Sequence, residues 1–505
     1  MSTRTIKATK GLITDILKYT ILIILQVILA PIILKVSGQE TLGAYSIVMQ
    51  IIGFGLVLDL GVGVALTRYL SQSFGANDNF HRFKEIFNVG RYFILLTNVL
   101  MALVIITVSV NIGRLITVSP QVLSSVSDSL LILSVWTIAR TPLILYSNSL
   151  LASQNMAIAN IIGIIGGVCR LLLSIGLIYY EFGLIGLVLA NIMSECLTLL
   201  LKRYYFNKFN PFLKLNWSKP NIKLMREITA FGITYWGVNV AIVLTLGSDS
   251  ILIGHLYGAA TVAVFYTTKI PSLMVIQLIF RISDNAGPAM NELISLQKFD
   301  EIRRAYFKII RYSMLVTFPF AIGIVCFNEG IISAWIGVDQ YAGHLTSFSL
   351  AAYAITQVIN HINAMIVVAT GNMNNWMSIS IGAGIAAISL AYLLGKLLGM
   401  QWVMFAIAFM ELPVFFFLMR RSLSSIGITF GDLWRHSILP AIQVSTPLIF
   451  LSLGLSTTNT VDNLVTLLAG IIGFVALWAA GFYCIGISVS ERGLIKNKIW
   501  SILHT

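Results

Sequence analysis

Charged residues are scarce in this chain of 505 residues. Asp, Glu, Lys and Arg together make up 10% of it, whereas hydrophobic residues make up 57%. A soluble globular protein is typically about 25% charged. The composition therefore excludes a water-soluble folded domain of any size.

Cysteine is also rare, with four residues in the whole chain. They lie far apart, inside apolar segments: Cys169, Cys196, Cys326 and Cys484. Because no CxxC pair or Cys/His spacing is present, we expect neither a disulfide framework nor a metal site.

Motifs of enzyme chemistry are missing as well. The sequence contains no GxGxxG fingerprint, P-loop, HExxH or GxSxG motif. We therefore expect no catalytic residue, no cofactor and no enzyme activity. Without an ATP-binding motif, any transport has to draw on an ion gradient, on the membrane potential or on the gradient of the substrate itself.

The chain does have fourteen apolar segments, each long enough to cross a bilayer, which takes about 20 mostly apolar residues. They are 12–35, 43–66, 90–112, 127–150, 158–180, 183–203, 228–254, 261–288, 305–327, 342–368, 376–398, 401–421, 436–455 and 462–486. The pattern predicts an all-α, polytopic integral membrane protein.

Basic residues are sorted onto one side of these spans. When the spans are threaded with the N-terminus inside, only Lys35, Arg114 and Lys396 fall in outside loops. Basic residues in short loops mark the cytoplasmic side, so both termini are expected there. The formal charge of +13 is spread over several cytoplasmic loops, which favours anionic lipid over nucleic acid as its partner.

Two sequence echoes indicate an internal duplication. Ala152-Ser-Gln-Asn-Met156 recurs as Ala369-Thr-Gly-Asn-Met373, and Leu42-Gly-Ala-Tyr45 recurs loosely as Ala263-Val-Phe-Tyr266. Parallel repeats of this kind occur in transporters. The predicted organisation is an N-terminal six-helix lobe, a basic cytoplasmic linker, a C-terminal six-helix lobe, and two extra helices with a cytoplasmic tail, at 1–203, 204–227, 228–421 and 422–505.

Charged residues within the spans are candidate functional groups, because each costs roughly 2.5–3.5 kcal/mol at mid-bilayer even on lenient scales. We assign Arg140, Arg170, Lys269, Arg281, Asp59, Glu195, Asp249, Asp284 and Glu411 to the spans. Loop distances allow a structural Arg170–Glu195 pair and a Lys269–Asp249 pair. Arg281 and Asp284 can pair locally, since they are three residues apart on one helix.

Arg140 has no acidic residue at matching depth on its hairpin partner. It instead mirrors Arg170, and two guanidinium groups at one depth repel unless they point apart, contact water or share an anion. Arginine suits bidentate phosphate binding, so Arg140 is our first candidate for contact with an anionic substrate. His361, with Asn360 and Asn363, is either a polar packing patch or part of a proton relay.

Short motifs resemble those of a known family. Leu42–Tyr45, Leu58–Gly63 and Tyr69–Gly75 look like the second-helix region of polysaccharide-export flippases, and Ala334-Trp-Ile-Gly337 resembles their short tryptophan-glycine segment. The chain resembles the oligosaccharide flippase, or polysaccharide transporter, branch of the multidrug/oligosaccharidyl-lipid/polysaccharide (MOP) superfamily. The resemblance implies two six-helix lobes around a central cavity, in which cationic side chains meet the pyrophosphate of a lipid-linked sugar.

The predicted function is thus an inner-membrane flippase of bacteria. It would move an undecaprenyl-pyrophosphate-linked oligosaccharide to the outer leaflet by alternating access, with a glycan polymerase complex as a candidate partner. We expect Arg140 and Arg281 to contact phosphate, with Lys269 and Arg170 in support. Coupling to protons or sodium ions, or gating, is assigned to Asp59, Asp249, Asp284 and Glu411.

Three alternatives stay open. An excess of acids over bases in the cavity would favour a cation-coupled drug or metabolite exporter of the same superfamily, and here the two are nearly balanced. A membrane-integral glycan polymerase or ligase would need a large outer loop, and the outer loops here are short. A transport-inactive scaffold is the third alternative.

Overall fold

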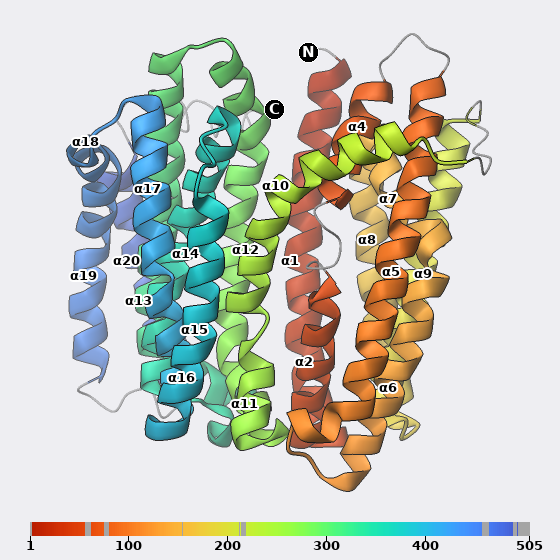
Figure 1. Cartoon of the computed structure of the whole chain (residues 1–505). Helices are drawn as coiled ribbons and strands as arrows, with labels where there is room; N and C mark the ends of the chain where they lie inside the picture. Colours follow the sequence, from red (N-terminus) through yellow and green to blue (C-terminus); the bar gives the residue numbers. More distant parts are fainter. Residues whose placement is uncertain are drawn as a thin grey trace, which may run out of the picture. The chain divides into compact units, whose positions relative to one another are not determined.

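The computed structural model describes residues 3–55, 62–74, 80–153, 155–211, 213, 219–456, 464–487 and 492. Every regular element among them is helical, which confirms the predicted all-α class (Figure 1). Asp59, one of the predicted coupling residues, lies outside the described residues.

The chain forms two compact units. The first comprises Met1–Tyr266 and Met377–Val403, and the second comprises Thr267–Trp376 and Met404–Thr505. The lobes predicted at 1–203 and 228–421 are based on an internal sequence repeat. That repeat stays a prediction.

Most helices of the first unit precede residue 266. They are α1 (Thr3–Ser37), α2 (Gln39–Gly53), α4 (Val62–Phe74), α5 (His81–Leu115), α6 (Pro120–Ala139), α7 (Thr141–Ala152), α8 (Met156–Tyr179), α9 (Gly183–Phe209), α10 (Ile222–Leu246) and α11 (Asp249–Tyr257), together with α15 (Trp376–Leu398). The helix α12 (Ala259–Ser295) begins in this unit and continues in the second.

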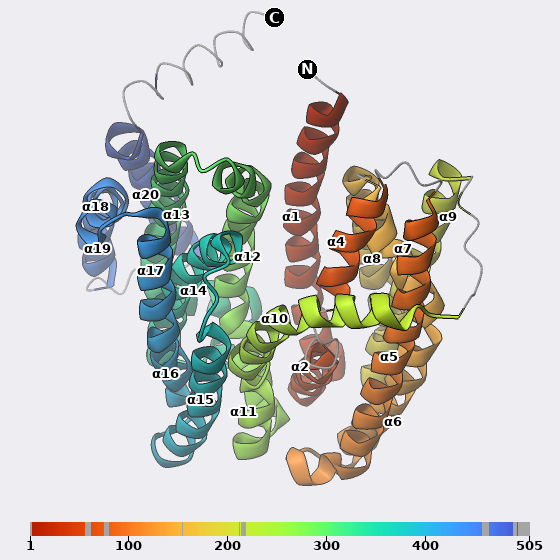
Figure 2. The ribbon, with the colours of Figure 1, turned by 45° about the horizontal axis from the view of Figure 1, so that its top comes forward.

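The second unit contains the rest of α12 and the remaining helices. They are α13 (Phe299–Ile336), the short η1 (Val338–Gln340), α14 (His344–Thr370), α16 (Gln401–Met410), α17 (Leu412–Ile426), α18 (Phe430–Leu433), the π-turn η2 (Trp434–Ile438), α19 (Leu439–Ser456), α20 (Leu464–Gly481) and the π-turn η4 (Phe482–Gly486). In Figures 1 and 2, α19 and α20 lie beside α13.

Local signals explain several helix ends. The side chain of Asn221 accepts hydrogen bonds from the backbone N–H groups of Lys223 and Leu224 and so caps the start of α10. Gly371 and Gly427 end α14 and α17 in the left-handed region, at φ 71° and 65°, where glycine has no Cβ penalty.

Eleven helices are long and apolar enough to cross a membrane in the described part of the chain, and they overlap eleven of the fourteen predicted spans. The other three predicted spans, 43–66, 228–254 and 436–455, do not match one continuous long helix. Residues 56–61 lie outside the described residues, α10 ends before α11 begins, and α19 follows a π-turn. The predicted span 127–150 is divided at Arg140, where α6 meets α7.

Each unit has its own apolar core. In the first, the rings of Phe83, Phe87, Tyr146 and Phe206 stack or meet edge to face at centroid distances of 5.3–6.3 Å. In the second, buried residues of α12, α13, α14, α17 and α19 pack together around the fully buried Tyr306. These cores position the polar side chains described next.

Candidate functional site

Glu195 of α9 is the partner of Arg140 in the first unit. Arg140 Nη1 donates to Glu195 Oε1 at 2.9 Å, and Trp136 Nε1 donates to Glu195 Oε2 at 2.7 Å. The sequence analysis searched only the hairpin partner of Arg140 for an acid, and so it did not predict this pair. The carboxylate comes from α9 through packing of α6 against α9, and not from the hairpin partner that the sequence argument considered.

Arg170 of α8 consequently does not pair with Glu195, and that alternative of the sequence analysis is wrong too. Among the described residues, Arg170 has no ion pair within 4 Å. The phenol groups of Tyr45 and Tyr266 are among its electrostatic neighbours. The hydroxyl of Tyr266 also accepts a hydrogen bond from Gln26 Nε2 at 2.7 Å.

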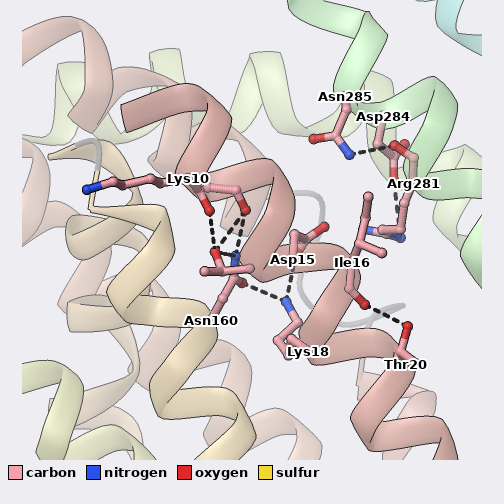
Figure 3. A network of polar contacts seen from close by, with 11 residues as sticks. Lys10, Asp15, Ile16, Lys18, Thr20, Asn160, Arg281, Asp284 and Asn285 are labelled. Atoms are coloured by element: carbon pink, nitrogen blue, oxygen red, sulfur yellow. Dashed lines mark hydrogen bonds and ion pairs between the residues drawn. The ribbon is translucent and has the colours of Figure 1, made fainter. Parts of the chain in front are cut away.

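A third cation of the first unit, Lys18 of α1, lies between α1 and α8 (Figure 3). Its Nζ donates to Asp15 Oδ1 at 2.8 Å and to Asn160 Oδ1 at 2.9 Å. The amide of Asn160 in turn donates to the carbonyl of Gly11 at 3.2 Å and to the hydroxyl of Thr14 at 3.3 Å. The network fixes α1 against α8 and neutralises the ammonium group.

Lys202 of α9 is less well compensated than Lys18. Its Nζ donates to Ser147 Oγ of α7 at 3.2 Å, and Lys18 and Glu195 are its charged neighbours. Within the described residues no carboxylate lies within ion-pair distance of Lys202. Together with Arg170, it is a cation whose charge is not cancelled by a direct partner.

Asp249, a predicted coupling residue, is buried in the first unit with 1% of its surface exposed. Its Oδ1 accepts from Gln50 Nε2 at 2.5 Å and from the backbone N–H of Ser250 at 2.7 Å. Gln50 Oε1 accepts from the backbone N–H groups of Ser250 and Ile251. Asp249 therefore joins α2 to the first turn of α11, where a carboxylate is favourable.

In the second unit, Asp284 of α12 holds two partners. Arg281 Nη2 lies 3.1 Å from Asp284 Oδ2, which confirms the predicted local pair, and His361 Nε2 of α14 lies 2.7 Å from Asp284 Oδ1. The His361 ring stacks on Phe280 with centroids 3.9 Å apart. Figure 3 shows Arg281 and Asp284 turned toward each other on α12.

The polar patch predicted around His361 divides among different partners. Asn360 Nδ2 donates to Glu411 Oε2 at 3.5 Å, and Asn363 Oδ1 accepts from the hydroxyl of Tyr306 at 2.7 Å. Glu411 is 5% exposed and stands where α16 meets α17. Asn360 and Asn363 thus pack within the unit, whereas His361 contacts a partly exposed acid.

Lys269, the last predicted cation, is 6% exposed in the second unit. No group of three or more His, Cys, Asp or Glu side chains could hold a metal ion in the part of the chain that the structure describes. The four cysteines are free thiols.

Sequence reasoning missed Lys18, Lys202 and the contact between His361 and Asp284. A signal existed for both lysines, because Lys18 falls inside the predicted span 12–35 and Lys202 inside 183–203, yet both were treated as flanking charges. The His361–Asp284 contact has no comparable signal, since it joins residues 77 positions apart.

Comparison with known proteins shows which fold this chain resembles. The sequence model of the MatE family matches residues 16–175, and no curated protein matches the chain in sequence. The fold is similar to that of a multidrug resistance MATE family transporter of the MOP superfamily solved in an inward-facing conformation. The TM-score is 0.64, the identity is 14%, and the match covers 83% of this chain and 98% of that one.

Two further solved structures agree. An outward-facing multidrug resistance MATE transporter of the MOP superfamily gives a TM-score of 0.59 at 16% identity, with 83% and 96% of the two chains covered. A MATE protein in complex with MaL6 gives 0.61 at 16%, with 84% and 97% covered. The chain therefore has the fold of MATE transporters and is a multi-pass membrane protein. The superfamily suggested by the sequence motifs agrees with these matches, whereas the polysaccharide-export branch does not follow from them.

Proposed function

We propose that this chain, which carries a MatE match and folds as MATE transporters do, is a secondary transporter. In this proposal it exports amphipathic organic solutes and draws on a cation gradient. The observation that carries the proposal is the extent of the fold match, which includes 96–98% of the length of solved MATE transporters. Their inward-facing and outward-facing forms motivate alternating access in this chain.

The charge pattern supports export of a solute over movement of a pyrophosphate-linked lipid. Arg140 and Arg281, the two arginines first expected to contact phosphate, each have a carboxylate within 3.1 Å. A phosphate could bind either guanidinium only by competing with that carboxylate, and leaving a charge unpaired in a low-dielectric site is costly. We therefore propose that Arg140 and Arg281 stabilise the packing of their units and do not bind substrate.

Cation coupling is assigned to Asp284 with Glu411 and Asp249 in support. Asp284 is 38% exposed at its side chain, so a proton or a small cation can reach it and exchange with its contacts to Arg281 and His361. Asp249 and Glu411 are almost fully buried. Partly accessible acids in membrane spans are typical of ion pathways.

Transport in proteoliposomes tests this function. The purified chain is reconstituted, a proton or a sodium gradient is imposed, and accumulation of the lipophilic cation ethidium is followed by fluorescence. We expect accumulation that collapses with the matching ionophore. Asp284→Asn should strongly lower this gradient-driven accumulation, and Asp300→Asn, which changes an acid 85% exposed at its side chain, is the matched control.

The second candidate is the lipid-linked oligosaccharide flippase of a bacterial inner membrane, with both termini cytoplasmic. It is favoured by Arg170 and Lys202, which have no ion pair among the described residues. Arg170→Ala and Lys202→Met should then stop export of a polyisoprenyl-pyrophosphate-linked glycan at unchanged protein level. If that glycan crosses the bilayer and ethidium does not, the exporter proposal is wrong.

A further inference from the structure

An apolar cavity of about 280 Å³ lies inside the second unit. It is formed by α12, α13 and α20, with Pro271 and Val275 from the first, Pro319 and Gly323 from the second, and Ile471 and Phe474 from the third. Trp478 also lines it, and its indole N–H is already used, because it donates to the carbonyl of Leu315 at 2.8 Å. The surface of the cavity is therefore almost entirely apolar.

The sequence creates this space at Gly323. A Cβ placed there would meet only the ring of Phe474, at 3.8–4.0 Å, which is ordinary van der Waals contact. A larger side chain would therefore fit without displacing the backbone. Glycine on α13 opposite the ring of Phe474 on α20 thus leaves part of the space between these helices open.

Water is a poor occupant of this cavity. A buried water needs two to four polar partners, whereas apolar cavities stay dry and bind apolar molecules. An engineered cavity of about 150 Å³ already accepts benzene, so this one has room for a segment of a hydrocarbon chain.

The cavity also reaches the surface that faces the bilayer. All three helices include candidate membrane spans, and Val475, which lines the cavity, is 48% exposed. Its neighbours on the outer side of α20, Ile472 and Leu468, are 67% and 49% exposed. A spanning helix meets lipid tails on such a face, so the bilayer itself supplies the ligand at high concentration.

We propose that this cavity is a binding site for an acyl chain of a membrane phospholipid. The chain inserts between α13 and α20 and fills the space beside Gly323. Because association of helices in a membrane depends on close packing rather than on the hydrophobic effect, the bound chain completes the packing of α20. It extends the apolar contact that Phe327, Leu448, Leu467 and Phe474 make between α13, α19 and α20.

Photo-crosslinking tests the site. The full-length protein is placed in nanodiscs with a phosphatidylglycerol or phosphatidylethanolamine that carries a diazirine in its acyl chain, irradiated, and mapped by mass spectrometry. We expect labels on α13 and α20 around Gly323 and Phe474. Gly323→Leu, whose side chain fills the space, should remove most of this labelling, and Gly323→Ala, which fills less of it, should lower the labelling less.

Gly473→Leu is the matched control. It adds the same side chain to α20 next to Phe474, where no atom lies within 4 Å of the new Cβ, and should keep the labelling of the wild type. A melting curve in detergent shows whether each variant is folded. Equal labelling of folded wild type and Gly323→Leu would overturn the proposal. The proposal would also fail if an isoprenoid alcohol or ethidium suppressed the labelling and an excess of unlabelled phospholipid did not. The site would then bind a different ligand.

Discussion

At the scale of single residues, Glu195 pairs with Arg140 and not with Arg170. It accepts hydrogen bonds from Arg140 and Trp136, and Arg170 has no ion pair among the described residues. The Arg140–Glu195 pair is 22% and 29% exposed at its side chains, so it is neither a surface pair nor a fully buried one. Its contribution to stability should lie between those limits.

Arg140→Ala should destabilise the protein by about 1.5–3 kcal/mol, the usual cost of losing a hydrogen bond to a charged group. The reason is that Glu195 keeps its charge and loses its cation. The double variant Arg140→Ala/Glu195→Gln should be less destabilised than the sum of the single variants. Unfolding midpoints in detergent measure both effects, and strict additivity would contradict a direct pair.

Asp284 and His361 should be coupled in function. Asp284→Asn removes the charge that both Arg281 and His361 contact, and it should lower gradient-driven transport by about tenfold or more, as loss of a charged hydrogen bond does. His361→Phe keeps the stacking on Phe280 and removes only the contact with the acid. We expect the two variants and their combination to have similar rates; independent, multiplying losses would show that the residues act separately.

At the scale of elements, Gly43 explains why the Leu42-Gly-Ala-Tyr45 motif contains glycine. A Cβ on Gly43 would overlap the carbonyl of Ala259, at the start of α12. The helices α2 and α12 touch here through backbone, and Gln39 Nε2 donates to the carbonyl of Ala260 nearby. Glycine is required by close approach, not by a turn.

Gly43→Ala should therefore destabilise the first unit by about 1–3 kcal/mol, as overpacking does. Gly53→Ala is the control, because the same helix has no atom within 4 Å of a Cβ there. The melting temperature of the purified variants distinguishes them. A Gly43→Ala protein as stable as Gly53→Ala would show that α2 can move away from Ala259 at no cost.

The start of α18 is set by a capping box outside the spans. The hydroxyl of Thr429 accepts from the backbone N–H of Asp432 and donates to its carboxylate at 2.6 Å, and this hydrogen bond lowers the pKa of Asp432. Since the pKa is lower in the folded state, the stabilisation is complete above about pH 4, the ordinary pKa of Asp. It is lost as the pH falls through the folded value.

Thr429→Ala should cost about 0.5–2 kcal/mol of helix stability at neutral pH, as loss of an N-cap does. Thermal melts of this variant and of the wild type at pH 7 and at pH 3 measure the effect. We expect the gap between them to shrink at the lower pH. A gap that grows on acidification would contradict the sign of the pKa change.

At the scale of the whole molecule, composition and hydropathy predicted the class and eleven of the long helices, because both follow from local sequence. The interruptions at Arg140 and between α10 and α11 were missed, since apolarity continues through them. The Arg281–Asp284 pair was predicted because it lies within one helix. The Arg140–Glu195 pair depends on which helix packs against which, and no local pattern carries that information.

The last two long helices, α19 and α20, pack against α13 in the second unit. The sequence predicts them as extra helices beside two lobes, and in the structure Ala441, Val444 and Leu448 of α19 are buried. Trp478 and Ser437 donate to backbone carbonyls of α13, those of Leu315 and Phe307. These contacts make α19 and α20 part of the packing of the second unit.

A chain that ends at residue 427 should consequently be less stable than the full chain. Truncation removes both hydrogen bonds to α13 and the packing that membrane helices depend on. We expect a lower melting temperature and a shift toward aggregate in size-exclusion chromatography after extraction in mild detergent. A chain ending at residue 492, which keeps both helices, is the control. If the chain ending at 427 has the same melting temperature as the control, α13 is stable without packing against α19 and α20. The last two helices would then be an addition to a complete transporter.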